Sequence, residues 1–257
     1  MLRSLSLLAA FAAFSVQVQA IETTDLQVQS AAVGEEDSAI AEAQPDPELL
    51  QAENIVRISG LTGLSEQARN IAQQVLNEQA APIGQQFDVV DRLASQWAPT
   101  VLQQNLISVL TAKLNKTQRD RLEQTLDSNT LKDVRSKELQ AIGQQSGPAY
   151  NSYIQRLRAN PVGGARLELI RKLDQAMQFS ALLKATREQV YPQLEAVISD
   201  WKPPQDWQAG LEQDVLEFLF YVHRSTPNND LERIIQLYTR PEMQLWLSGV
   251  RKQLAAG

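Results

Sequence analysis

Cysteine is absent from this 257-residue chain, and histidine occurs once, at position 223. The first absence excludes a disulfide framework, thiol chemistry and lipid attachment through cysteine. A single histidine excludes a metal site built from several histidines, and no cysteine is there to replace them. The folded part must therefore be held together by its apolar core, for which a hydrophobic content of 43% is sufficient.

Long apolar runs are also missing, apart from one near the N-terminus. Arg3 precedes an apolar stretch from Leu5 to Val16, and Val18-Gln19-Ala20 follows it. This order is typical of a secretory signal peptide, and the stretch is shorter than the roughly twenty residues that span a membrane. The alternative is an uncleaved anchor. We predict a signal peptide at 1–20 and a mature chain that is exported, periplasmic and soluble, with no transmembrane segment.

Positive charge is missing from the segment that follows. Residues 21–50 contain eight acidic side chains and no Lys or Arg, although the whole chain has a net charge of only -6. The segment also lacks aromatic residues, and this composition favours a disordered acidic leader. The rest of the chain is almost neutral. That balance argues against nucleic-acid binding, which needs a concentrated positive surface.

The alternating pattern of β-strands is absent beyond residue 50, where apolar residues recur at helical spacing. Clusters of Gly, Pro, Ser and Asn divide this region into roughly ten helices. Thr117 to Asp120 resembles a capping box, Ser128 and Asp206 are candidate N-caps, and Pro241 suits the first turn of a helix. We predict an all-α fold.

The two halves of the folded body share a pattern that indicates an internal duplication. Glu78-Gln79-x-x-Pro82 matches Glu188-Gln189-x-x-Pro192 at an offset of 110 residues, and Trp97 matches Trp207 at the same offset. After the turn cluster at Ser225–Asn229 the offset becomes 112. We therefore predict two tandem related helical units.

Each unit is predicted to end in a helical hairpin, Leu102–Leu114 with Thr117–Ile142 and Leu211–His223 with Leu231–Leu254. The most buried helix should be the one containing Val215–Val222, which is apolar on most sides. One polar stripe relieves it, formed by Asp214, Glu217, Tyr221 and Arg224. The predicted organisation is a signal peptide (1–20), the leader (21–50), unit 1 (51–145), a connecting helix and loop (146–164), and unit 2 (165–257).

The second unit carries a resemblance to a known family. It opens with Arg166-Leu167-x-x-Ile170-x-x-Leu173-Asp174-x-Ala176 and closes with Leu237-Tyr238-Thr239-Arg240-Pro241. These residues resemble a family of proteobacterial periplasmic helical domains of unknown function, which end in a hairpin with a Phe-Tyr-x-Ser-Pro-x-Gly signature. Leu237, Arg240 and Met243 depart from its first aromatic residue, serine and glycine. The resemblance covers about residues 165–255, with a degenerate copy in the first unit, and implies a location and a fold without catalytic residues.

Catalytic motifs are missing as well, since the chain has no nucleophile elbow, phosphate loop or dinucleotide-binding fingerprint. Paired carboxylates occur at Asp88/Asp91 and at Asp214/Glu217, each pair on one helical face. A solvated helix face explains both pairs, and packing explains His223. The alternative is an envelope hydrolase, or a hydrolase activator, that acts on peptidoglycan or lipid through Asp214, Glu217 and His223.

Two sets of residues suit binding. A basic stretch could meet lipid headgroups, the acidic leader or an acidic partner, or could be a solvated face; it consists of Arg156, Arg158, Arg166, Arg171 and Lys172. An aromatic set could line an apolar groove between the units, or could belong to the core; it consists of Trp97, Trp207, Tyr191 and Trp246. We predict a non-enzymatic binding module of the cell envelope, with no metal or cofactor, whose partner is an envelope protein or an apolar ligand.

Overall fold

The computed structural model describes residues 46–145 and 147–256, and every regular element in these ranges is a helix. The all-α prediction is confirmed. The predicted signal peptide and residues 21–45 of the predicted leader lie outside the described residues. The elements are α1 (Pro47–Ser59), η1 (Leu61–Gly63), α2 (Leu64–Glu78), α3 (Ile83–Trp97), α4 (Pro99–Lys113), α5 (Lys116–Leu126), α6 (Asn129–Gln144), α7 (Pro148–Ala159), α8 (Gly164–Met177), α9 (Phe179–Val197), α10 (Trp207–Val222), α11 (Asn228–Tyr238) and α12 (Pro241–Ala256).

The folded body begins earlier than the predicted leader boundary at residue 50. Helix α1 starts at Pro47, and the Asp46 side chain caps it by accepting a hydrogen bond from the Glu48 backbone amide. An acidic N-cap followed by proline is a strong start signal for a helix. Glu48 also accepts a hydrogen bond from the buried Arg119 guanidinium, 2.6 Å away. The predicted boundary was wrong because Asp46 and Glu48 belong to the folded body: Asp46 caps α1, and Glu48 pairs with Arg119.

Most predicted helix ends are where the sequence places them. The Ser128 hydroxyl accepts a hydrogen bond from the Leu131 amide at the start of α6, and α12 begins at Pro241. Helix α10 starts directly after Asp206, although the Asp206 side chain makes no capping bond. The capping box before α5 is formed by Asn115 and Gln118, so its predicted position was two residues too late. Asn115 occupies the N-cap because its side chain and that of Gln118 each bond the other's backbone amide.

The long second arm of each predicted hairpin is two helices. Residues 117–142 are divided between α5 and α6 by a break at Asp127 and Ser128, and residues 231–254 between α11 and α12 by a break at Thr239 and Arg240. A serine N-cap stops the first arm and a first-turn proline stops the second, because each favours a new helix start over continuation.

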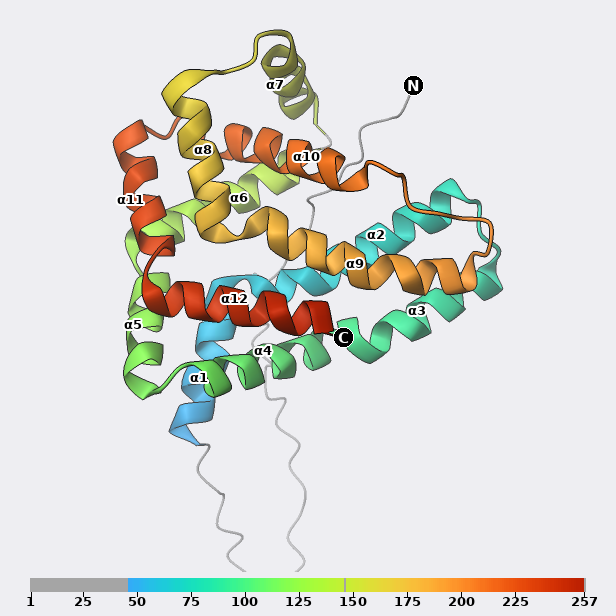
Figure 1. Cartoon of the computed structure of the whole chain (residues 1–257), viewed down its shortest axis with the longest axis horizontal. Coiled ribbons are helices and arrows are strands. Elements are labelled where there is room, and N and C mark those ends of the chain that lie inside the picture. The colour runs from blue at the N-terminus through green and yellow to red at the C-terminus, as the bar shows by residue number, and fades with distance from the viewer. Residues whose placement is uncertain (1–45, 146, 257) are drawn as a thin grey trace, which may run out of the picture.

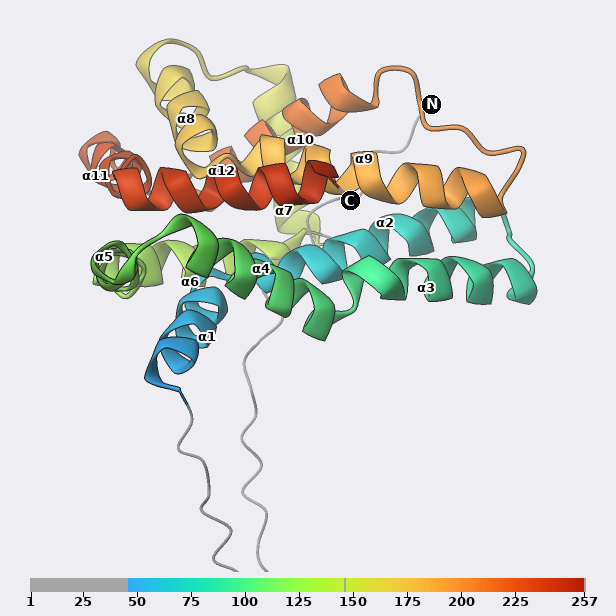
Figure 2. The same cartoon turned by 60° about the horizontal axis from the view of Figure 1, so that its bottom comes forward.

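The helices form two layers, with α8–α12 in one layer and α2–α6 in the other, as Figure 2 shows. Helix α2 packs against α9 across the layers, and the two helices overlap in the view of Figure 1. The last helix of each half packs against the other half, α12 against α4 and α6 against α10. This exchange joins the two halves through one shared core.

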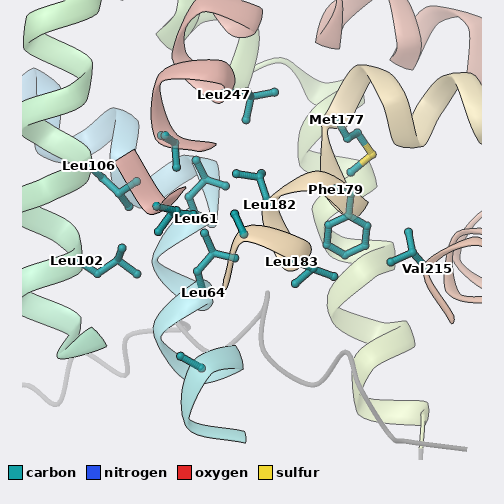
Figure 3. Close-up of a cluster of buried hydrophobic side chains, with 14 of the residues drawn as sticks. Leu61, Leu64, Leu102, Leu106, Met177, Phe179, Leu182, Leu183, Val215 and Leu247 are labelled. Carbon is teal, nitrogen blue, oxygen red and sulfur yellow. The ribbon is translucent and has the colours of Figure 1, made fainter. Parts of the chain in front are cut away.

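The core is a single hydrophobic cluster that contains residues of both halves. Figure 3 shows part of it, where Leu61, Leu64 and Leu106 of the first half approach Leu182 and Leu247 of the second. The predicted burial of α10 is confirmed for its second half, because every residue from Glu217 to Val222 is buried. It is not the most buried helix, since eight of the 15 residues of α2 are buried against eight of the 16 residues of α10.

The middle of the polar stripe of α10 is covered, whereas Arg224 at its end is exposed. Helix α7 packs on α10, and Glu217 and Tyr221 are 4% and 3% exposed. The Tyr221 ring meets those of Tyr150 and Tyr153 edge to face, with ring centroids 4.7 and 5.3 Å away. The sequence pattern placed these side chains on one face, and α7 then supplied polar and aromatic partners for them.

The predicted duplication receives mixed support from the helix positions. Helices α5 and α11 have the same length and an offset of 112 residues, as do α6 and α12. The tryptophan correspondence does not hold, because Trp97 ends α3 inside the core and Trp207 begins α10 half-exposed. Pro82 likewise precedes α3, whereas Pro192 lies inside α9. The duplication stays a prediction that rests on the helices after each turn.

None of the helices within 46–145 and 147–256 combines the length and the apolar character that a membrane span requires.

Candidate functional site

A groove lies where the two halves meet, among α3, α4, α9 and α12. The C-terminal end of α12 approaches the place where α3 passes into α4 (Figure 1). The groove has a volume of about 360 Å³, which is within the range of small-ligand sites. It is lined by Ser95, Gln96, Leu102, Asn105, Leu106, Val109, Gln193, Val250, Gln253 and Leu254.

The floor of the groove is apolar and follows from helical spacing. Leu102, Leu106 and Val109 recur on one face of α4, and Val250 and Leu254 recur on one face of α12. All five side chains are at least nine-tenths buried. They belong to the shared core, so the packing of the core also fixes the positions of the floor side chains.

The edge of the groove is polar but uncharged. Four carboxamide side chains reach it from four helices, namely Gln96, Asn105, Gln193 and Gln253. The Gln193 amide group donates to the Gln96 carbonyl across a long 3.4 Å, and Gln193 Oε1 is buried without a hydrogen-bond partner among the described residues. A buried acceptor of this kind is a position where a ligand donor would be favourable.

The width of the groove depends on one glycine. A methyl group on Gly249 would lie 2.9 Å from Val109 Cγ1 and 3.2 Å from Lys113 Cγ. Helix α12 therefore approaches α4 more closely than any larger residue would allow. Val109 and the neighbouring Val250 both line the groove, so this contact sets the spacing of its floor.

The predicted basic stretch is divided between two environments. Arg158 binds Glu217, and Arg166 donates to the carbonyl of Thr226 and to the Asn228 side chain, 2.9 and 2.8 Å away. Arg156, Arg171 and Lys172 are exposed, and Arg171 lies 3.5 Å from Glu168. Arg158 and Arg166 thus hold the fold together, although the Arg158 side chain is itself 47% exposed, and a binding role for the other three cations stays a prediction.

None of the predicted groove aromatics is among the residues that line this groove. Trp97 and Trp246 are buried in the core, 3% and 0% exposed. Tyr191 and Trp207 lie together on the second half, with ring centroids 5.2 Å apart, and the Arg187 guanidinium lies over the Trp207 ring at 5.7 Å. This cation–π contact and the edge-to-face rings give these side chains a packing role.

The paired carboxylates behave differently from one another. Asp88 and Asp91 are exposed on α3. Glu217 accepts two hydrogen bonds from Arg158 and one from Gln213. Burial, aided by the charge of Glu217, raises the pKa of Asp214 to about 6.

His223 lies at the other end of α10 and is fully buried. Burial, with the nearby charges of Lys137 and Arg166, lowers its pKa to about 3, so the ring is neutral under ordinary conditions. It is nine residues beyond Asp214, or roughly 13 Å along a helix axis. The three side chains named for a hydrolase are therefore not gathered at one point.

Among residues 46–145 and 147–256, no group of three or more His, Asp or Glu side chains is placed to hold a metal ion.

The sequence did not predict the four carboxamides of the groove. No local signal could have found them, because they come from four helices and Gln is common throughout the chain.

Searches of protein-family models, curated proteins and solved structures find no match for this chain. The resemblance to the periplasmic helical family stays a prediction.

Proposed function

We propose that the chain is a non-enzymatic binding module of the cell envelope, and that the groove among α3, α4, α9 and α12 takes an uncharged, extended segment of a partner protein. The observation that supports this most directly is the ring of carboxamides above an apolar floor. A carboxamide side chain donates and accepts hydrogen bonds as a peptide group does. Four of them around one groove match the backbone of an extended segment.

The floor and the buried acceptor add to this argument. Leu102, Leu106 and Leu254 offer apolar surface to alternate side chains of the segment, and Gln193 Oε1 offers an acceptor for a backbone N–H. No charged side chain lines the groove, so a charged segment would lose water without gaining a partner. A purely apolar small ligand fits less well, because it would cover the carboxamides and leave them unsatisfied.

Selection from a displayed library of random peptides, followed by titration calorimetry of the selected sequences, tests this proposal. Gln253→Trp fills the groove from an exposed position, and Gln104→Trp makes the same change at an exposed position of α4 that does not line it. We expect Gln253→Trp to weaken peptide binding at least tenfold and Gln104→Trp to leave it unchanged. The selected peptides should be poor in charged residues.

The proposal fails if selected peptides bind both variants equally, or if charged residues dominate the selected sequences. Amide chemical-shift changes on peptide addition provide a second measurement. They should centre on the residues of the groove, and changes centred on α7 and α8 would point instead to the predicted basic stretch.

The alternative function, an envelope hydrolase or its activator, has one observation in its favour. The raised pKa of Asp214 suits a general acid. That hypothesis requires substitutions at Asp214, Glu217 or His223 to abolish a cellular activity without lowering thermal stability. Because Glu217 and His223 are buried, we expect their substitutions to lower the melting temperature, which would count against the hydrolase.

A further inference from the structure

A second, smaller cavity lies at the edge of the core and is separate from the groove. Its volume is about 40 Å³, and its walls are mostly leucine, methionine and aromatic side chains from both halves. Figure 3 shows part of the wall, with Leu61 of the first half beside Leu182 and Leu247 of the second, and with Met177 next to Phe179. Helix α12 lines this cavity with its first turns and the groove with its last turns.

Two polar groups of opposite kind line the same cavity. Trp246, which is 0% exposed, has an indole N–H without a hydrogen-bond acceptor among the described residues. Glu138 has a buried carboxyl oxygen, Oε1, without a donor. The neighbouring Arg135 gives a hydrogen bond to the Leu126 carbonyl instead. Native proteins leave few buried polar groups unsatisfied, so one unused donor and one unused acceptor at one cavity call for an occupant.

The two groups define the chemistry of that occupant. It must accept a hydrogen bond from Trp246 and donate one to Glu138, and a hydroxyl group does both. The rest of it should be mainly apolar, because ten of the thirteen lining residues are leucine, methionine or aromatic, and Ser59 and Arg135 donate hydrogen bonds to backbone carbonyls. The cavity is larger than the roughly 10–15 Å³ that one water needs, and the flexible side chains of Met177 and Met243 allow it to widen.

We propose that this cavity is a binding site for a small apolar molecule that carries one hydroxyl group, with the hydroxyl between Trp246 Nε1 and Glu138 Oε1. The site is independent of the groove, since the two share no lining residue. A matched pair of fluorinated probes tests it: 2,2,2-trifluoroethanol, and 1,1,1-trifluoropropane, in which a methyl group replaces the hydroxyl.

Fluorine NMR titration of the full chain measures both affinities. We expect saturable binding of trifluoroethanol at least tenfold tighter than that of trifluoropropane, because a site built to hydrogen-bond a hydroxyl discriminates against the analogue without it. Glu138→Met replaces the acceptor with an apolar side chain of similar length, and this change should abolish the preference for trifluoroethanol. Trp246→Phe, which removes the donor, should reduce it.

The comparison in the natural chain decides the question even if a variant does not fold. Equal affinities, or tighter binding of trifluoropropane, would show an apolar cavity without hydroxyl recognition and overturn the proposal. The absence of saturable binding by either probe would mean that water alone occupies the cavity. An unchanged preference in a folded Glu138→Met variant would also overturn it, because the hydroxyl would then be bound elsewhere.

Discussion

Arg158 of α7 holds the buried carboxylate of Glu217 in α10 through two hydrogen bonds, each 2.7 Å long. The Glu217 side chain is 5% exposed and that of Arg158 is 47% exposed. The paired geometry matches the guanidinium fork to both carboxylate oxygens. It explains why a charged residue is tolerated in the buried half of α10, and it fixes α7 to that helix.

Removing the cation should therefore be costly. We expect Arg158→Ala to lower the free energy of unfolding by about 2–3 kcal/mol, because Glu217 would keep a buried charge with Gln213 as its remaining donor. Arg156→Ala is the matched control, since Arg156 is exposed and bonds the Ser152 carbonyl. Urea unfolding of both variants measures the difference, and equal losses would show that the ion pair contributes little.

The close approach of α12 to α4 predicts a strong effect at Gly249. Gly249→Ala would bring a methyl group against Val109 and Lys113, so we expect a loss of about 1–3 kcal/mol in the free energy of unfolding. Gly143→Ala in α6 meets nothing within 4 Å and should raise stability by up to about 1 kcal/mol. Thermal unfolding of the two variants checks the prediction. A neutral Gly249→Ala would mean that α12 has room to move.

Glu138 predicts a pH dependence of stability. Burial raises its pKa to about 7, against the influence of Arg135, and Tyr238 is the other titratable group beside it. The unfolded chain ionises this carboxyl at lower pH than the folded chain, so its contribution is full below the unfolded pKa. The contribution falls as the pH rises from about 4.5 to about 7, by an amount on the order of 1–3 kcal/mol.

Glu138→Gln should remove this part of the pH dependence. Relative to the natural chain, the variant should therefore be more stable at pH 8 than it is at pH 5. Urea unfolding of the natural chain and the variant at both pH values measures it. A variant with the same difference between pH 5 and pH 8 as the natural chain would contradict a raised pKa at Glu138. Asp214, whose pKa is also raised, titrates in both proteins and cancels in the comparison.

The first turn of α1 gives a further prediction. Glu48 supplies the counter-charge of the buried Arg119, so Glu48→Ala should lower the free energy of unfolding by about 1–2 kcal/mol. Glu53→Ala removes a carboxylate from the same helix and serves as the control, with an expected effect within about 0.5 kcal/mol. Chemical denaturation distinguishes the two, and similar effects would show that α1 is held by its apolar face alone.

Local signals in the sequence were sufficient for much of the fold. Ser128 and Pro241 carry their own start signals, and the apolar run around Phe218 indicates burial without knowledge of any partner. The start of α1 was missed because its acidic residues were grouped with a leader of similar composition. Local patterns describe one helix at a time. They do not locate the start of a helix when the preceding segment has the same amino-acid composition.

Tertiary contacts were outside the reach of the sequence. Trp97 and Trp207 share a spacing from a proline, yet one ends a helix in the core and the other begins a helix beside Arg187. Gln96 and Gln193 become neighbours only because α3 packs on α9. Because both side chains are neutral, no pattern of charges in the sequence predicts that they are in contact.

The exchange of final helices between the halves constrains how the chain acquires its structure. The inner face of α4 is covered by α12, which lies far later in the sequence. Without α12 the leucines of α4 are less buried, so the first half cannot complete its apolar core alone. Folding of the first half therefore depends on contacts that are distant in sequence, and removal of α12 would expose apolar surface on α4.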